Sequence, residues 1–242
     1  GAGTSDGADT TDIEGNPRPD PEGSNPDMGA YENPNGIPQY MPVVPNVPAD
    51  HATIQAALTA ANATDTVLVQ PGTYTENIIW PETNGIKLIS AGDSSNTIID
   101  GGGVSSVIYM NPQTATIDTT TLIQGFKITN GGNVSKGGGI LLYNVSPKLI
   151  GLSIFNYTTT FDWPNRMGGG IYMTNSNPIL REVSIENNSS WQGSGLSLYS
   201  SNPTLTNVEI NNNYGNSANS EGGGIYLDGS SSPILNYVLI KG

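Results

Sequence analysis

The 242-residue chain contains no cysteine and a single histidine, His51. Without cysteine the chain has neither a disulfide framework nor a thiolate metal site, and one histidine excludes a zinc site built from several histidines. No apolar run approaches the roughly 20 residues that a membrane-spanning helix needs. The absences therefore exclude disulfide-rich domains, zinc modules and helical membrane spans.

Charge is scarce as well, since only 12% of the residues are charged, against about 25% in ordinary globular domains. The net charge is -13, with 21 acidic residues against 8 basic ones. Nucleic acids and anionic lipids require a positive surface, so neither is expected as a partner. The 31 glycines favour a fold rich in tight turns.

The first fifty residues differ from the rest, with nine acidic residues, nine prolines and one basic residue, Arg18. They show no periodic apolar pattern, so they bury little surface on their own. We predict an acidic Pro/Gly-rich segment over 1–47, extended or loop-like unless it packs on a neighbour, and a folded repeat domain over 48–242.

Four acidic residues near the start are candidate calcium ligands: Asp6, Asp9, Asp12 and Glu14. Their spacing does not match the EF-hand loop. The alternative interpretation is a solvated acidic linker. Calcium is the one cofactor that the sequence suggests.

One short helix is predicted over 51–62, because apolar residues recur at helical spacing there and Asp50 provides an N-cap. The apolar positions are Ile54, Ala57, Leu58 and Ala61. The following "DTVLVQPGTY" indicates a strand closed by a Pro-Gly turn. No further helix is expected.

The second part of the chain repeats itself. Three stretches align without a gap, at 136–154, 167–185 and 192–210, and a fourth at 221–240 is one residue longer. Their final isoleucines are Ile154, Ile185, Ile210 and Ile240, which lie 31, 25 and 30 residues apart. Repeats of this length are typical of solenoids.

Each repeat joins glycines to two short strand-like runs, with a proline before the second run. One repeat is too short to bury a sheet face, but stacked coils can pair each strand with its copy one turn along, about 4.8 Å away. Glycine suits the corners, where φ is positive. The pattern therefore predicts an all-β parallel solenoid with the isoleucines in one interior column.

An asparagine follows two residues after four of the isoleucines, including the weaker copy that ends at Ile128. These residues are Asn130, Asn156, Asn187 and Asn212. Asparagine tolerates left-handed backbone, and stacked amides can bond one another. We therefore predict an internal asparagine ladder with a structural role.

The stretches "TIQAALTAANATDTVLVQPGTYTENI", "GFKITNG" and the repeated "GGGIY…NPTLTNVEI" resemble the right-handed parallel β-helix proteins of the pectin-lyase-like superfamily. More narrowly, they resemble the large secreted bacterial repeat proteins of that group. The resemblance covers 48–242. It implies a right-handed β-helix whose N-terminal end is capped by the helix at 51–62, in a secreted or cell-surface protein.

The segment "DIEGNPRPDPEGSNPDMGAYENP" (12–34) is similar to segments that close the C-terminal end of such β-helices, whereas no closing cap precedes Gly242. Unpaired strand edges favour association. Three explanations stay open: a window from tandem β-helix domains, end-to-end association of copies through the open last coil, or residues 1–40 folding back over the same chain.

The segments between repeats vary most and carry aromatic residues, which are natural platforms for sugar rings. The candidate carbohydrate-binding residues are Phe161, Asp162, Trp163, Arg166, Trp191, Tyr214 and Glu221. The alternative is that these aromatic rings pack under their own loops.

The resemblance also implies a reaction, since enzymes of this superfamily cleave polysaccharides with acidic residues on neighbouring coils. General acid–base catalysis needs two carboxyl groups held at a definite distance. Glu182 and Glu186 are the nearest such pair, and no dense acidic cluster or hydrolase aspartate motif is present. The sequence therefore favours a non-catalytic protein over an enzyme.

Three functions follow from these observations. The first is a non-catalytic extracellular solenoid that acts as a surface, adhesive or matrix element. The second is a carbohydrate-binding β-helix with a polysaccharide partner. The third is a fragment of a polysaccharide lyase or glycoside hydrolase.

Overall fold

The computed structural model describes residues 10–11, 14–15, 17–18, 42–158 and 167–242. The chain divides into two compact units, Gly1–Val43 and Val44–Gly242. In the first unit, Thr11 and Pro17 form an antiparallel bridge, and the Arg18 amide donates to the Thr10 carbonyl at 2.9 Å.

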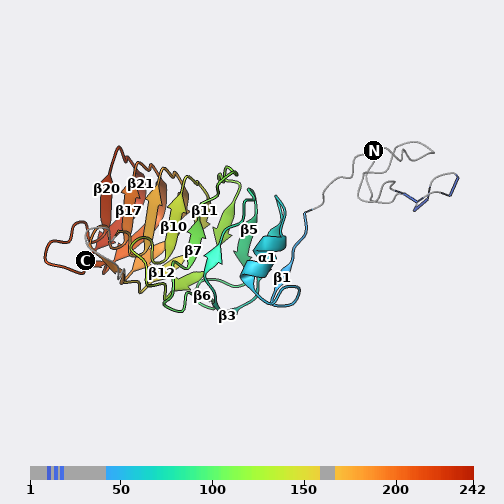
Figure 1. The fold of residues 1–242 in the computed structure, drawn as a ribbon, viewed down its shortest axis with the longest axis horizontal. Coiled ribbons are helices and arrows are strands. Elements are labelled where there is room, and N and C mark those ends of the chain that lie inside the picture. The colour runs from blue at the N-terminus through green and yellow to red at the C-terminus, as the bar shows by residue number, and fades with distance from the viewer. Residues whose placement is uncertain (1–9, 12–13, 16, 19–41, 159–166) are drawn as a thin grey trace. The chain divides into compact units, whose positions relative to one another are not determined.

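The second unit is a parallel β-solenoid of about six turns (Figure 1). Successive strands of one turn lie on three walls, and each strand pairs in parallel with its counterpart in the next turn. The prediction of an all-β parallel solenoid is confirmed.

The first wall consists of β4 (Ile78–Ile79), β7 (Ile108–Met110), β10 (Ile140–Tyr143), β13 (Ile171–Thr174), β17 (Leu196–Tyr199) and β20 (Ile225–Asp228). The second wall consists of β1 (Asn46–Val47), β2 (Thr66–Val69), β5 (Lys87–Ser90), β8 (Leu122–Gln124), β11 (Lys148–Ile150), β14 (Ile179–Arg181) and the first halves of β18 (Thr204–Asn211) and β21 (Ile234–Lys241). The third wall consists of β3 (Gly72–Thr75), β6 (Thr97–Asp100), β9 (Lys127–Thr129), β12 (Ser153–Phe155), β15 (Ser184–Glu186) and the second halves of β18 and β21. A short pair, β16 (Ser189–Ser190) and β19 (Tyr214–Gly215), lies in the connecting loops.

The core is a set of apolar columns that run along the solenoid. Ile154 pairs with Ile185, and Ile185 with Ile210, in strict register. All three side chains are fully buried. The predicted interior isoleucine column is therefore confirmed, and it forms because alternate strand residues point inward.

The corners of each turn are made by residues with positive φ. In the turn that begins at residue 167, these are Gly168, Asn175, Glu182 and Asn187, with φ of 61°, 47°, 57° and 55°. Glycine and asparagine enter this left-handed region at little cost. The prediction that glycine forms the corners holds for Gly168, while asparagine and a glutamate form the others.

The remaining glycines of each repeat serve a different purpose, which is close packing between turns. A Cβ on Gly170 would lie 2.7 Å from the Gly195 carbonyl oxygen and 2.7 Å from Cγ2 of Ile185. Gly195 is equally crowded, by the Gly224 carbonyl and by Ile210. Any larger side chain would push the turns apart.

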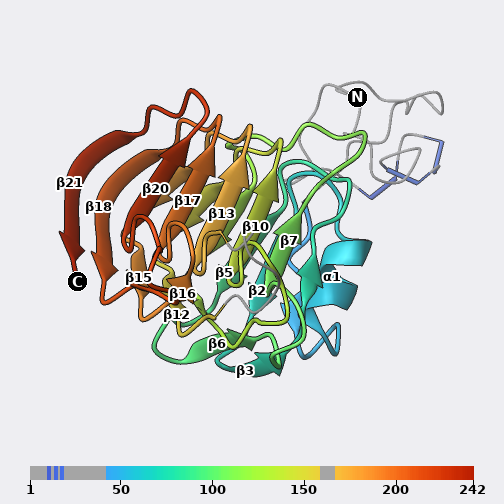
Figure 2. The ribbon, with the colours of Figure 1, turned by 60° about the vertical axis from the view of Figure 1, so that its left-hand side comes forward.

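Helix α1 (Ile54–Ala60) lies at one end of the solenoid (Figure 2) and buries Ile54, Ala57 and Leu58. It is shorter than the predicted 51–62, and its N-cap is Thr53 rather than Asp50. It begins later because the Glu76 carboxylate accepts hydrogen bonds from the amides of Ile54 and Gln55, both at 2.9 Å. No helix in the described part of the chain has the length and hydropathy to span a membrane.

The first strand of the second unit starts before residue 48. β1 pairs with β2, so Asn46 and Val47, which the sequence places in the segment 1–47, belong to the second wall. At the other end, apolar side chains of the last turn are exposed, among them Ile234 at 56% and Ile240 at 50%. End-to-end association through this turn stays a prediction.

The first part of the loop 111–121, which connects the first wall to the second, is bound by the Glu82 carboxylate. Glu82 accepts hydrogen bonds from the amides of Gln113, Thr114 and Ala115 at 2.6, 3.0 and 3.0 Å. These bonds favour the ionised form and lower the pKa of Glu82 to about 2.

Replacing Gly170 by alanine should lower the free energy of unfolding by about 1–3 kcal/mol, because the added methyl group overpacks the contact between turns. Urea denaturation measures the loss. Ser153→Ala, a small change on the outer side of β12, is the control and should stay within about 0.5 kcal/mol of the native protein. Equal stability of Gly170→Ala would contradict the close-packing explanation.

Glu82 should make stability dependent on pH in the acidic range. Its folded-state pKa is depressed from 4.5 to about 2, so its contribution is complete above pH 4.5 and is lost as the pH falls toward 2. Glu82→Gln should flatten this part of the curve of melting temperature against pH. Glu209→Gln, on β18 of the third wall, is the control for the removal of one negative charge.

Candidate functional site

Five tyrosines form a zigzag stripe on the outer side of the first wall, which we call the tyrosine face. They are Tyr109, Tyr143, Tyr172, Tyr199 and Tyr226, one from each of β7, β10, β13, β17 and β20. Tyr109, Tyr172 and Tyr226 lie in one register column, whereas Tyr143 and Tyr199 lie in the next. Because alternate residues of a strand share a side, all five rings belong to the outer face.

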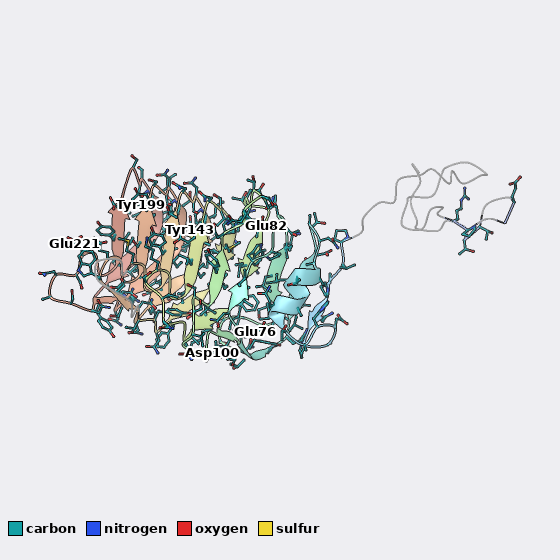
Figure 3. All side chains as sticks on the ribbon, in the orientation of Figure 1. Glu76, Glu82, Asp100, Tyr143, Tyr199 and Glu221 are labelled. Carbon is teal, nitrogen blue, oxygen red and sulfur yellow. The ribbon has the colours of Figure 1, made fainter. Side chains whose placement is uncertain are left out.

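The first three rings of the stripe contact each other diagonally. The centroids of Tyr109 and Tyr143 are 6.2 Å apart with the planes at 86°, and those of Tyr143 and Tyr172 are 6.1 Å apart at 54°. Edge-to-face and tilted arrangements of this kind are favourable for aromatic rings. Figure 3 shows Tyr143 and Tyr199 on one side of the solenoid, away from Glu76 and Asp100.

Two cavities lie along the tyrosine face. One, of about 310 Å³, is lined by Tyr143, Tyr172 and Tyr199 together with Lys136 and Asp228. The other, of about 300 Å³, also contains Lys136 and Tyr143 in its wall. The shared residues make the two cavities neighbours along the face.

Both signs of charge are present on this face. The Lys136 ammonium lies 3.4 Å from the Tyr172 hydroxyl and 4.8 Å from the centre of its ring, an arrangement that combines a hydrogen bond with a cation–π contact. Asp228 is in register with Tyr199. The face can therefore offer a donor and an acceptor to one polar ligand.

The hydroxyls of Tyr143, Tyr172 and Tyr226 stay protonated at neutral pH. Burial raises the pKa of Tyr143, with the Lys136 charge opposing the shift, and burial also raises the pKa of Tyr172. The pKa of Tyr226 is raised by burial and then by the charges of Asp228 and Glu221. Neutral hydroxyls can both donate and accept hydrogen bonds.

A column of bridged residues, three of them polar, borders the tyrosine face. Lys136, Met167, Gln192 and Glu221 form successive parallel bridges from turn to turn. The Gln192 side-chain amide donates a hydrogen bond to the Glu221 carboxylate at 2.8 Å. Glu221, a predicted carbohydrate-binding residue, is therefore placed beside the turns that carry the tyrosines.

The other predicted sugar-binding residues are less well placed or lie elsewhere. Trp191 is half-buried, and Tyr214 is 58% exposed on β19. Four predicted residues lie outside the described part of the chain: Phe161, Asp162, Trp163 and Arg166. A role for these six residues, and for Glu221, in carbohydrate binding stays a prediction.

The sequence did contain the signal for the tyrosine face. Tyrosine alternates between the fourth and second positions of "ILLY", "IYMT", "LSLY" and "IYLD". Both positions point to the same side of a strand. The stripe was not predicted, because the candidate sugar-binding residues were taken from the variable loops and not from the repeated strands.

Of the four candidate calcium ligands, the structure describes only Glu14. Asp6, Asp9 and Asp12 lie outside the described residues, and Glu14 is exposed. No group of three histidine or acidic residues in the described ranges could hold a metal ion. Calcium binding by the first segment stays a prediction.

The two glutamates that sequence reasoning weighed as a catalytic pair have local partners instead. Glu182 is exposed and lies 3.6 Å from Arg181, and Glu186 accepts a hydrogen bond from the Ser184 hydroxyl. Glu182 also occupies a corner with positive φ. Each carboxylate therefore has a local partner of its own on the outside of the solenoid.

The internal amide ladder exists, but one residue later than predicted. Asn130, Asn156, Asn187 and Asn212 all have positive φ, and they are exposed or half-buried at corners. The buried amides are Asn188 and Asn213, joined by a hydrogen bond of 2.9 Å. The left-handed residue turns the chain, so the side chain of the next residue points inward.

Asn188 and Asn213 also bind main-chain groups. The Asn188 side-chain oxygen accepts from the Tyr157 amide at 3.1 Å, and the Asn213 side-chain oxygen accepts from the Asn188 amide at 3.0 Å. The Asn213 side-chain amide donates to the Ile185 carbonyl at 2.8 Å. The ladder therefore satisfies polar groups where no strand pairs them.

Parallel strands stacked in register, left-handed corners and buried ladders define the second unit as a parallel β-helix. A family model described as "Right handed beta helix region" matches residues 106–242, more than half of the chain. The chain belongs to this right-handed β-helix family, as its sequence pattern predicted.

One solved structure shares this fold. A pectin methylesterase variant in complex with a hexasaccharide is 13% identical with a TM-score of 0.51, over 81% of this chain and 66% of the other. The pectin methylesterase of Erwinia chrysanthemi is also 13% identical, with a TM-score of 0.38 over 84% of this chain. The chain thus spans just under two thirds of these enzymes' length. No curated protein matches the sequence significantly.

Asn188→Ala should lower the free energy of unfolding by about 2 kcal/mol or more, because it leaves the Tyr157 amide without a partner in the core and removes one of the two hydrogen bonds to the Asn213 side-chain oxygen. Asn212→Gly, at the neighbouring corner, is the matched control and should change stability by about 0.5 kcal/mol or less. Thermal and urea unfolding measure both. If Asn212→Gly lowered stability more than Asn188→Ala, the corner asparagines would form the stabilising ladder instead.

Proposed function

We propose that the protein binds polysaccharide on its tyrosine face, with the glycan lying along the solenoid axis. The observation that carries this proposal is the zigzag of five tyrosines on consecutive turns. Four of the rings are half-buried or exposed, whereas Tyr172 is only 3% exposed and packs against Tyr143. Partly exposed rings with a polar tip suit sugars, which present an apolar CH face and a rim of hydroxyls.

The spacing of the stripe suits a polymer. Tyrosines of one column are two strands apart, about 9.6 Å, and the second column places a ring between them. A chain of pyranose rings that follows the stripe can therefore meet aromatic surface at Tyr109, Tyr143, Tyr199 and Tyr226, while the buried Tyr172 supports Tyr143 from below the surface. Lys136 and Asp228, which line the same cavity as Tyr143, supply partners for hydroxyl or carboxylate groups.

The comparison with the pectin methylesterase that was solved with a hexasaccharide supports a carbohydrate ligand, since both chains share the β-helix fold. We place the protein at the surface of, or secreted from, a bacterial cell, where glycan binding would give it an adhesive or matrix role. The acidic residues on this face are Asp228 and Glu221, and neither has a second carboxylate as a hydrogen-bond partner in the described structure. Binding is therefore favoured over cleavage.

Tyr143→Ala and Tyr199→Ala should each weaken glycan affinity by about tenfold, the equivalent of about 1.4 kcal/mol of lost ring contact. Isothermal titration against neutral and acidic hexasaccharides measures the effect. Tyr237→Ala, at an 87% exposed position on β21, is the control and should bind like the native protein.

The same titration separates the alternatives. Loss of affinity in Tyr214→Ala but not in Tyr143→Ala would move the site to the loop aromatics. Release of methanol or of new chain ends during incubation would instead identify an esterase, hydrolase or lyase.

A further inference from the structure

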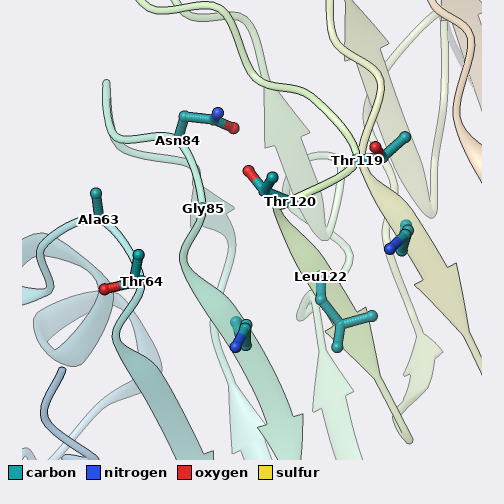
Figure 4. A pocket seen from close by; sticks show the side chains of 9 residues that line it. Ala63, Thr64, Asn84, Gly85, Thr119, Thr120 and Leu122 are labelled. Carbon is teal, nitrogen blue, oxygen red and sulfur yellow. The ribbon is translucent and has the colours of Figure 1, made fainter.

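A separate cavity lies on the outer side of the second wall, across β5, β8 and β11. Its volume is about 610 Å³, and its floor includes Lys87, Leu122 and Lys148. Figure 4 shows Leu122 within the cavity, with Thr119 and Thr120 at one rim and Ala63 and Thr64 at the other. The cavity shares no residue with those of the tyrosine face.

The floor concentrates positive charge in an acidic protein. Lys87 and Lys148 each pair in register with Leu122, from opposite sides, and they are two of only eight basic residues in a chain of net charge -13. Neither ammonium forms an ion pair within the described residues. Two unpaired cations on either side of an apolar residue are available to an anionic ligand.

The acidic groups near this cavity accept hydrogen bonds from neighbouring residues. The Asp118 carboxylate accepts from the Thr120 amide at 2.8 Å and from the Thr120 hydroxyl at 2.6 Å. The Asp65 side chain is fully buried and accepts from the Asn62 amide at 2.8 Å. Asp118 remains an exposed negative charge beside the rim, but the charged residues that line the cavity itself are Lys87 and Lys148.

The rim of the cavity is held in place before any ligand arrives. The Asn84 side-chain oxygen accepts from the Asp118 amide at 3.0 Å and from the Thr121 hydroxyl at 2.9 Å. The Thr121 hydroxyl in turn accepts from the Gly85 amide at 2.9 Å. With Glu82 fixing the same loop, the cavity is organised in advance, which lowers the entropic cost of binding.

The distance between the lysines indicates the kind of ligand. They lie two strands apart, so their Cα atoms are separated by about 9.6 Å, too far for both to hold one small anion closely. A 1→4-linked sugar advances by about one strand spacing for each ring. Carboxylates on alternate rings of an acidic oligosaccharide would meet the two lysines, with the CH face of the ring between them on Leu122.

We propose that this cavity binds an acidic oligosaccharide, a chain of uronate residues, through Lys87, Leu122 and Lys148. The threonine hydroxyls at the rim serve the sugar hydroxyls. The site is independent of the tyrosine face, because it lies on another wall of the solenoid and uses charge rather than aromatic surface.

The test is isothermal titration of the full chain with tetragalacturonate at low salt, in a Tyr143→Ala background that weakens the tyrosine face. Lys87→Gln and Lys148→Gln should each weaken binding by about tenfold, and high salt should weaken it further. Lys241→Gln, a basic residue on β21 outside the cavity, is the matched control and should bind like its parent. Melting temperatures of all variants check that the fold is intact.

The ligand series tests the assignment itself. Fully methyl-esterified tetragalacturonate, which is neutral, should not bind, and an acidic peptide of equal charge should bind at least tenfold more weakly than tetragalacturonate. Absent binding of tetragalacturonate, equal binding of the neutral ester or the peptide, or unchanged affinity in both lysine variants would each overturn the proposal. Loss of glycan binding in Tyr143→Ala alone concerns only the tyrosine face.

Discussion

The structure depends on one constraint, the parallel main-chain hydrogen bonding that holds each turn directly above its copy. Pairing in strict register places equivalent residues of successive turns in columns, as Ile154, Ile185 and Ile210 show. A column can be occupied only by side chains that tolerate a like neighbour about 4.8 Å away. The sequence repeats because of this requirement: isoleucine, glycine, serine and asparagine each return at the same position of successive turns.

The corners are where this constraint is hardest to meet, because strand pairing stops and main-chain groups need other partners. Two buried ladders supply them. Ser176 accepts from the Val145 amide, and the same bond recurs from Ser176 to Ser201 and from Ser201 to Ser231. Asn188 and Asn213 do the same at another corner. The interior is therefore apolar along the walls and polar at selected corners, and both parts are built by stacking.

The outer surface follows the same geometry and gives the solenoid its chemistry. Side chains spaced by whole strand intervals can face a polymer whose units repeat on a similar scale. On the first wall this places tyrosines on five consecutive turns, and on the second wall it places Lys87 and Lys148 on either side of Leu122. Aromatic contact and charge are thereby separated onto different walls of one β-helix.

By itself the sequence determined the repeat, the solenoid, the interior isoleucines and the single helix, because each leaves a local or periodic pattern. Only the tertiary structure decided which polar residues point inward, since one left-handed residue reverses the side on which the next side chain falls. That reversal is why the ladder uses Asn188 rather than Asn187. The tertiary structure also brought together Lys87 and Lys148, which are distant in the chain and belong to no motif. Their proximity comes from the winding of the coil, which converts a separation of two turns into two strand spacings.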